Sequence, residues 1–261
     1  MSMIIVTGHG HMLNNYFIMT DVYFTKQMRK ATREIHAASD ALVNAKLAFA
    51  LSDNSVWAEG LLIFYEIFRY LEEAMDRLKD KHVGELDIEG MRRTKAFEQD
   101  LNFYLGNDWQ KNYTPRESVA KYLLYLSKLE TSDPDMLMAY IYHLYMGLLS
   151  GGQILARKRA IYKKLLPFSK QAEGGYAVTS FGDYPISKIK RNLVKAMNDV
   201  AQNLDEDTKN KLIEESKTVF VMNNEIIRTV EGANKVFLKK MAVAVAAVAV
   251  IAAAYAIWKH R

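Results

Sequence analysis

The spacing of apolar residues limits the fold of this chain more than any other feature of its sequence. Between residues 61 and 71 the apolar positions include Leu61, Phe64, Ile67, Phe68 and Leu71, a spacing that places all five on one face of a helix. Strand-type alternation is hard to find, and only 4 prolines interrupt the 261 residues. The pattern therefore predicts an all-α fold.

The same periodicity predicts helices along most of the chain. The expected segments are a helix through Met28, Ala31, Ile35 and Ala38 capped by Asp21 or Thr25, a long helix through Leu61 and Leu71 capped by Asn54 or Ser55, then 91–105 with a stop at Gly106, 115–130, 134–164, 186–203 and 205–232. Residues 169–184 are rich in glycine and serine and are expected to form a loop. We expect one helical domain over residues 22–232, after a flexible extension of residues 1–21.

The composition excludes several classes of site. There is no cysteine, which excludes disulfides and thiolate metal sites and disfavours structural zinc. The formal net charge is only +5, and basic residues are interspersed with acidic ones. This distribution argues against nucleic acid as a partner and suits an anionic ligand or a membrane surface at least as well.

The C-terminal segment Met241–Trp258 contains 18 residues without a charged side chain. As a helix it would extend about 27 Å, close to the roughly 30 Å of hydrocarbon in a bilayer. Tyr255 and Trp258 lie where interfacial aromatic residues are common, although nine alanines keep the segment only moderately apolar and a buried helix is the alternative. We expect a transmembrane tail anchor after a linker at residues 233–240, with the preceding domain in the cytosol.

A histidine and two arginines share one face of the expected N-terminal helix. In the stretch RKATREIH, His36 lies seven residues after Arg29 and three after Arg33, so the three side chains leave the helix on one side. Asp40, one turn later, is placed to accept a ring N–H from His36 and fix its tautomer. Such a set suits haem, in which iron is bound by histidine and propionates by arginine. The alternative is a surface helix with ordinary charge pairs.

Three glycines interrupt a strongly helical segment that reads YMGLLSGGQ at residues 145–153. Each interior glycine costs a helix roughly 0.5–1 kcal/mol relative to alanine. Without side chains at Gly147 and Gly151, the backbone can approach a flat macrocycle and leave space for a small gas ligand. The alternative is close packing of two helices, because Gly147 and Gly151 also form a small-xxx-small pair.

Five sequence blocks together resemble the eukaryotic haem oxygenases over about residues 23–230. The blocks, in the order of the family, are MRKATREIH (28–36), FYEIFRYLEE (64–73), FEQDLNFYLGNDWQ (97–110), LSGGQ (149–153) and EESKTVFVMNNEI (214–226). The resemblance implies an all-α, single-domain haem-oxygenase-like fold with a C-terminal transmembrane helix. It also implies an enzyme that uses haem b as substrate and cofactor, consumes O2 and electrons, and releases biliverdin, carbon monoxide and ferrous iron.

The resemblance further implies partners and site residues. The electrons would come from NADPH–cytochrome P450 reductase or a similar NADPH-dependent donor, and the protein would be a tail-anchored monomer of the endoplasmic reticulum membrane that binds no nucleic acid. The implied site residues are His36 as the iron ligand, Arg29, Arg33 and Lys190 near the propionates, Phe220 in the pocket, and Gly147, Gly151, Tyr142 and Asn223 in the catalytic distal helix and its polar network.

The sequence departs from the family pattern around the distal glycines. Leu148 replaces the aspartate of the usual G-D-L-S-G-G-Q, and a leucine can neither order water nor deliver protons during oxygen chemistry. Leu144 and Phe68 stand where many relatives have an arginine and a tyrosine, and Val194 replaces an arginine that clamps a propionate. We therefore expect slow turnover and a mixture of biliverdin isomers.

Several assignments stay open at this point. A non-enzymatic haem sensor or carrier on the same fold, and a tail-anchored interaction protein without a cofactor, are the alternatives to an enzyme. Arg191 and Lys195 are candidates for the missing propionate clamp. His143, on the distal helix, is either a second haem ligand or a partly buried structural histidine, and the structural role is favoured. His82 is assigned to a solvated turn.

Overall fold

The computed structural model describes residues 23–47, 53–165 and 174–231, and scattered residues of the tail between 238 and 258. Within these residues there are helices and no strands, which confirms the predicted all-α class. The α-helices are α1 (Phe24–Ala31), α2 (Arg33–Leu47), α3 (Asn54–Arg77), α4 (Thr94–Leu105), α5 (Glu117–Ser132), α6 (Leu137–Gly147), α7 (Gln153–Leu165), α8 (Ile186–Gln202) and α9 (Glu206–Arg228). Short elements lie between them: η1 (Gly84–Leu86), η2 (Trp109–Asn112), η3 (Pro134–Met136), η4 (Leu148–Gly152) and η5 (Ala177–Thr179).

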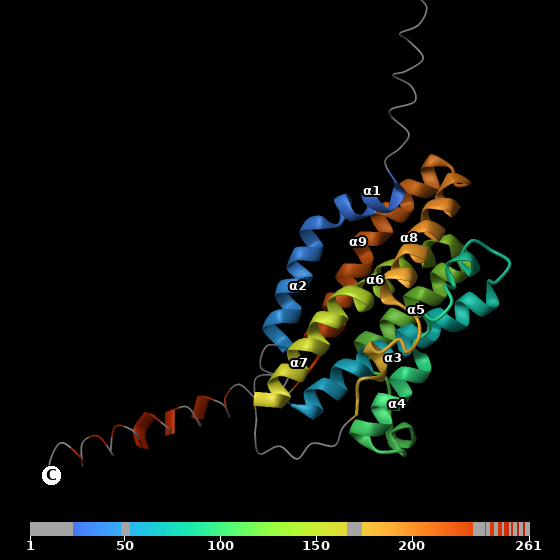
Figure 1. Cartoon of the computed structure of the whole chain (residues 1–261). Coiled ribbons are helices and arrows are strands. Elements are labelled where there is room, and N and C mark those ends of the chain that lie inside the picture. Colours follow the sequence, from blue (N-terminus) through green and yellow to red (C-terminus); the bar gives the residue numbers. More distant parts are fainter. Residues whose placement is uncertain are drawn as a thin grey trace, which may run out of the picture.

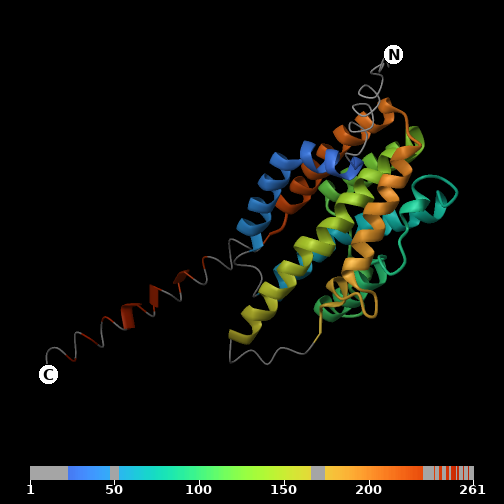
Figure 2. The same ribbon diagram turned by 45° about the horizontal axis from the view of Figure 1, so that its top comes forward.

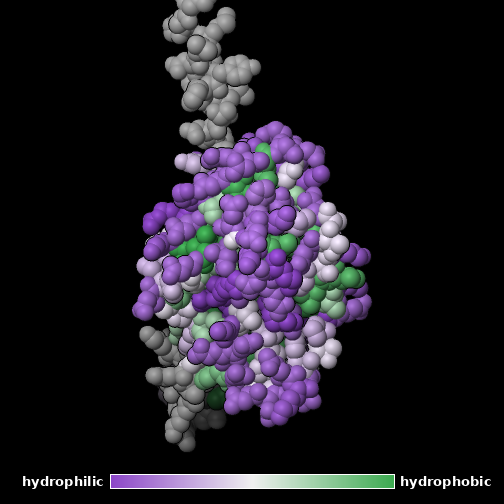
Figure 3. Space-filling view, turned by 90° about the vertical axis from the view of Figure 1, so that its right-hand side faces the viewer, coloured by the Kyte–Doolittle hydropathy of each residue, from purple (hydrophilic) through white to green (hydrophobic). Residues whose placement is uncertain are grey.

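Helix α6 forms the centre of the bundle (Figure 1). Eight of its 11 residues are buried, because the segment is apolar almost all round and neighbouring helices cover it on several sides. Helices α3, α5, α8 and α9 pack against it, and α9 in turn carries α1 and α2. The face on the right-hand side of Figure 1 is largely hydrophilic, with its apolar side chains in small separate patches (Figure 3). The apolar residues are therefore gathered inside one core.

The periodicity predicted a single N-terminal helix, but the structure contains two, α1 and α2. Thr32 separates α1 from α2 with φ −97° and ψ 2°, and its hydroxyl donates to the carbonyl of Met28 at 2.9 Å. A threonine that bonds back to the carbonyl four residues earlier bends a helix. Thr25 lies inside α1, which begins after Tyr23, and Asp21 lies outside the described residues. The bend sends α2 in its own direction along α9 (Figure 2).

The other predicted helix ends differ in detail. Asp53, rather than Asn54 or Ser55, caps α3 by accepting the backbone N–H groups of Ser55 at 2.9 Å and Val56 at 3.2 Å. Gly106 ends α4 as predicted, with φ +88°, a value that glycine adopts without the strain that a side chain would bring. The N-terminal cap of α3 is thus one residue earlier than predicted, and the glycine that ends α4 is the predicted one.

The predicted tail anchor is not found as a transmembrane helix. Among the residues that the structure describes, no helix is both long and apolar enough to cross a bilayer. The described residues of segment 241–258 are helical and exposed; Val245, for example, is 63% exposed. The extension at residues 1–21 lies outside the described residues, as does most of the linker at 233–240.

Candidate functional site

Two helices that carry predicted site residues lie along α9. Helix α2 provides His36, the run from α6 through η4 to α7 provides the glycines, and α9 packs against both α2 and α6. At one end the phenyl ring of Phe220 on α9 contacts His36, with ring centres 5.3 Å apart. The same ring contacts His143 of α6, with ring centres 5.1 Å apart. Phe220 of α9 therefore connects the two walls of the site, of which α2 is one and the run from α6 to α7 is the other.

A second link joins the same two walls further along. The ammonium group of Lys158 on α7 donates to the side-chain oxygen of Asn44 on α2 at 3.2 Å. Helices α2 and α7 lie next to each other (Figure 1), and the two walls run in the same direction between the two links. In the sequence, Gly147 and Gly151 fall between His143 and Lys158, the two residues that make these links. The helix that carries the predicted iron ligand is thus linked at two points to the helices on either side of the predicted distal glycines.

The space around the two glycines explains why the chain has no side chains there. Gly147 and Gly151 are exposed, and a Cβ atom added to either would meet no described residue within 4 Å. Gly147 has the ordinary helical values φ −62° and ψ −48°, and Gly151 is not among the glycines with positive φ. Neither backbone strain nor helix packing requires glycine here, so the small-xxx-small alternative is wrong. The face is open for something that is not part of the chain.

The distal segment itself is a π-helix. Residues Leu148–Gly152 form a wide π turn between α6 and α7, a feature that often marks a functional site inside a longer helix and one of the usual causes of a kink. The side chain of Leu148 covers this turn, because its Cδ1 lies 2.9 Å from the position that a Cβ added to Gly152 would occupy. Leu148 therefore packs against its own turn and the core.

His36 lies beside the carboxylate group that follows it by one helical turn in the sequence. Its Nδ1 lies 3.2 Å from the Oδ2 atom of Asp40, and the side chain is 55% exposed. An imidazole whose Nδ1–H is taken by a carboxylate presents Nε2 as the nitrogen for a metal. The residue fits the role of an axial iron ligand.

The cations predicted to meet the propionates come from α1, α2 and α8. Arg29 and Arg33 are exposed, and neither forms a salt bridge with a residue that the structure describes. Lys190 of α8 donates to the hydroxyl of Ser150 in the π turn at 2.9 Å. Lys195 pairs with Asp199 in its own helix, whereas Arg191 is exposed. Of the two candidates for the missing clamp, Arg191 is therefore the one left without an intrahelical partner among those described.

Tyr142 and Asn223 make contacts at the edges of the site. Tyr142 is buried, and burial raises the pKa of its phenol, while a hydrogen bond with the side chain of Thr25 and the charge of Arg29 lower it by less. Tyr142 thus ties α6 to the α1 helix. Asn223 accepts a hydrogen bond from the hydroxyl of Tyr122 at 3.1 Å, so its amide oxygen is already engaged with the core.

Tyr145, on the helix that leads to the glycines, is engaged with the core. The hydroxyl of Tyr145 donates to the buried carboxylate of Glu72 at 2.8 Å, and Glu72 also accepts the backbone N–H groups of Arg93 and Thr94 at the start of α4. Phe68 packs edge-on against Tyr145, with ring centres 5.0 Å apart. Tyr145 therefore anchors α4 instead of contributing a proton route to the distal face.

Sequence reasoning did not identify two residues of this site. Ile154 is 55% exposed despite its apolar side chain and follows Gly147 by two helical turns, so it extends the open face with an apolar side chain. The spacing of residues 147, 151 and 154 was the available signal. Ser150, whose hydroxyl accepts a hydrogen bond from Lys190, lies in the LSGGQ block. The sequence alone does not show which side chain contacts it.

His143 is the most unusual polar residue of the site. Its Nε2 atom is buried and has no hydrogen-bond partner among the described residues. Burial, together with the smaller effect of nearby His36, lowers the pKa of its imidazole from 6.5 to about 3, so the ring is uncharged at neutral pH. By contrast His82, predicted in a solvated turn, is half-buried and pairs with Asp135 at 3.0 Å.

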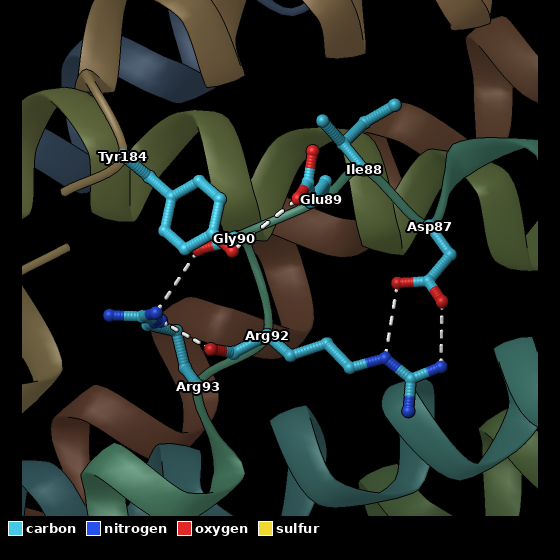
Figure 4. Close-up of a pocket in the computed structure, with 7 residues that line it drawn as sticks. All are labelled: Asp87, Ile88, Glu89, Gly90, Arg92, Arg93 and Tyr184. Carbon is cyan, nitrogen blue, oxygen red and sulfur yellow. Dashed lines mark hydrogen bonds and ion pairs between the residues drawn. The ribbon is translucent and has the colours of Figure 1, made fainter. Parts of the chain in front are cut away.

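A hollow elsewhere on the surface offers no comparable chemistry. It has a volume of about 340 Å³ and is lined by Asp87, Ile88, Glu89, Gly90, Arg92, Arg93 and Tyr184 (Figure 4). Arg92 pairs with Asp76 and Asp87, and Arg93 donates to the carbonyls of Gly90 and Ser180. The guanidinium groups of Arg92 and Arg93 are thus already engaged, by carboxylates and by carbonyls respectively. Nor does any group of three or more metal-ligating side chains occur among the described residues.

Comparison with known proteins identifies relatives of the whole helical domain. The family model described as Heme oxygenase matches residues 22–229. Human heme oxygenase 1 is 28% identical over 215 residues, which cover 79% of this chain and 71% of the human protein. The crystal structure of heme oxygenase 2 from Chlamydomonas reinhardtii without heme has a TM-score of 0.71 and 29% identity, and covers 79% of this chain and 97% of that one. The heme oxygenase-1 of the cyanobacterium Synechocystis, solved with heme, has a TM-score of 0.73 and 25% identity, with coverage of 86% and 98%.

Proposed function

This chain belongs to the haem oxygenase family, and on that basis we propose how its own residues bind haem and limit its cleavage. It is a haem-degrading oxidoreductase, so the reading as a cofactor-free interaction protein is set aside and the enzyme is favoured over a sensor or carrier. Bound haem supplies both the iron that activates O2 and the macrocycle that is cleaved. The observation that supports the site is the open glycine face next to a histidine whose Nδ1 is held by Asp40.

Haem enters between α2 and the π-helical segment in this proposal. His36 would bind the iron through Nε2, and Asp40, whose Oδ2 lies 3.2 Å from the Nδ1 atom of His36, would keep the imidazole in the required tautomer. Gly147 and Gly151 allow the distal backbone to approach the other face, and Ile154 covers part of the apolar edge. Nothing in the described structure fills the positions of the missing Cβ atoms, so the glycine face itself is open to the macrocycle.

In this proposal the propionates are bound by cationic side chains of α1, α2 and α8. Arg29, Arg33 and Lys190 neutralise them, and Arg191 takes the place of the clamp that Val194 cannot provide, because a guanidinium pairs with a carboxylate through two parallel hydrogen bonds. Val194 is an apolar residue packed against the core. Arg191 lies three residues before Val194, so a clamp at Arg191 is displaced along α8 and fixes the macrocycle less firmly. A less firmly held macrocycle supports attack at more than one meso carbon and a mixture of biliverdin isomers.

Proton supply is the step that this chain's residues perform poorly. Leu148 has no group that donates or accepts a proton, and it packs over Gly152. Tyr145 is engaged by Glu72, and Phe68 has no hydroxyl. An ordered proton donor contributes typically about 10²–10⁴-fold to a rate, so its absence supports slow turnover.

Restoring an acid tests this explanation. We expect Leu148→Asp to raise the rate of biliverdin formation at least about tenfold, because the carboxyl group can order water beside the glycine face and deliver protons. The rate is measured from the absorbance of biliverdin with saturating reductase. Leu148→Asn is the matched control, since it has the same shape and cannot act as an acid. Equal rates for the Asp and Asn variants would show that protons reach the site by another route.

The electron donor and the cellular location are further parts of the proposal. The exposed guanidinium groups of Arg29, Arg33 and Arg191 near the open edge suit an acidic NADPH-dependent reductase such as NADPH–cytochrome P450 reductase, because opposite charges steer such encounters. The 18 uncharged residues at 241–258 support a tail anchor in the endoplasmic reticulum membrane with the catalytic domain in the cytosol.

A further inference from the structure

Helix α7 is the most basic helix of the described structure. Its 13 residues, Gln153–Leu165, include five lysines and arginines and no acidic residue. The whole chain has a formal net charge of +5, so this one helix carries as much positive charge as the chain has in excess. A partner of negative charge is therefore the first kind to consider for it.

The exposed side chains of α7 share one face. Ile154 and Ile161 are 55% and 58% exposed despite their apolar side chains, and Arg157 and Lys158 between them are exposed as well. These four positions have the i, i+3, i+4 and i+7 spacing of a single helical face. The C-terminal half of α7 lies at the edge of the bundle in both ribbon views (Figures 1 and 2). The face thus offers apolar area and positive charge together.

The opposite face of α7 fixes this orientation. The guanidinium group of Arg159 is fully buried, lies 4.7 Å from the centre of the Trp57 ring, and donates to the side-chain oxygen of Asn54 at 2.6 Å. Arg159 follows Arg157 by two residues, so it points to the other side of the helix. Rotation of α7 to bury Ile161 would break these contacts.

The cations of the exposed face are not neutralised by the part of the protein that the structure describes. Neither Arg157 nor Lys158 forms a salt bridge with a described residue. The ammonium group of Lys158 donates to the uncharged amide of Asn44 near the end of α2, at 3.2 Å. The positive charge of this face is therefore available to a partner.

The end of α9 lies beside the same end of α2. Lys46 of α2 donates to the carbonyl of Arg228 at 3.0 Å, and Arg228 is itself exposed. Because Asn44 of α2 contacts Lys158, α9 ends on the side of the molecule where the exposed face of α7 lies. The uncharged segment 241–258 follows α9 in the sequence.

We propose that Arg157, Lys158 and Ile161 form a surface that binds a membrane rich in anionic lipids. Lysine and arginine side chains are attracted to negatively charged headgroups, and an apolar side chain beside them enters the boundary between headgroups and acyl chains. A nucleic acid would use the cations and leave the isoleucine in water. The inference adds a contact of the folded domain to the tail anchor of the proposed function, and it does not depend on haem.

A fluorescent label on this face reports whether it meets lipid. The chain has no cysteine, so Ile161→Cys in the full chain carries nitrobenzoxadiazole at one position. We expect its emission to rise at least about twofold with vesicles of phosphatidylserine and phosphatidylcholine, because the label leaves water, and to stay unchanged with phosphatidylcholine alone. About 0.5 M NaCl, which shortens the screening length to about 4 Å, should abolish the rise. Leu124→Cys, on α5 and 57% exposed, is the matched control and should show no rise.

Charge reversal tests the cations themselves. In the labelled chain, Arg157→Glu should weaken the lipid-bound state about 30-fold, since each basic side chain near an anionic surface contributes about fivefold and reversal counts twice. No rise, an equal rise on uncharged vesicles, a rise that survives Arg157→Glu, or an equal rise from Leu124→Cys would overturn the inference. Sedimentation with phosphatidylcholine vesicles tests the tail anchor separately, and hemin is absent throughout, so failure of the anchor or of the haem site gives a different result.

Discussion

Replacing His36 by alanine should stop haem cleavage while leaving the protein folded. The side chain is 55% exposed, lies 3.2 Å from Asp40 in its own helix and contacts the Phe220 ring, so its loss should change the free energy of unfolding by less than about 1 kcal/mol. Changes to groups that merely orient a metal ligand cost about 10–100-fold in affinity or activity. Removal of the ligand itself should therefore lower the rate of biliverdin formation by about 100-fold or more.

The experiment for His36 separates ligand loss from unfolding. Biliverdin formation and the hemin absorption spectrum are measured alongside thermal unfolding by circular dichroism. Added imidazole, which can occupy the vacated space, should recover part of the rate. His82→Ala is the matched control, because it removes another histidine–aspartate pair, and it should keep full activity. A His36→Ala variant that cleaves haem at the normal rate would show that iron is held elsewhere.

A side chain at Gly151 should abolish haem binding and leave the empty protein as stable as before or more stable. In the described structure an added Cβ meets nothing within 4 Å, and exchanging an interior helical glycine for a good helix former gains roughly 0.5–1 kcal/mol. The same side chain would project into the volume that the macrocycle needs. We expect Gly151→Leu to weaken hemin binding by about 100-fold or more, and Gly151→Ala to have a smaller effect.

The Gly151 series is informative because stability and binding move in opposite directions. Thermal midpoints are measured without hemin, and dissociation constants by hemin titration. Ala120→Leu adds the same side chain to an exposed position of α5 and should change neither quantity appreciably. If Gly151→Leu binds hemin as tightly as the wild type, the glycine face is not the haem site.

Much of the fold could be predicted because it depends on local patterns. Apolar spacing located the helices from α3 to α9, and Gly106 marked the end of α4 through the backbone conformation that glycine permits. The division of the first helical segment could not be predicted from spacing, since the apolar residues keep their periodicity across the bend. It depends on the hydroxyl of Thr32 and its bond to Met28, one of several local conformations open to a threonine.

The site could be predicted only in part, for a different reason. His36 and Asp40 are one helical turn apart, so their contact follows from the sequence alone. The glycines were ambiguous until their surroundings were known, because close helix packing and an open ligand face require the same residues. Contacts between distant segments, such as Lys158 with Asn44 and His143 with Phe220, depend on how α2 and α6 lie across α9. No local pattern encodes that arrangement.

Catalysis of haem cleavage by this site is tested most directly by the products of a single turnover. The full chain is loaded with one equivalent of hemin without oxygen, O2 and an NADPH-dependent reductase are then added, and biliverdin and carbon monoxide are quantified per haem. We predict that both products form in equal amounts, slowly, with more than one biliverdin isomer. Haem that binds but is recovered intact, with no carbon monoxide released, would contradict the assignment of this chain as a haem-cleaving enzyme.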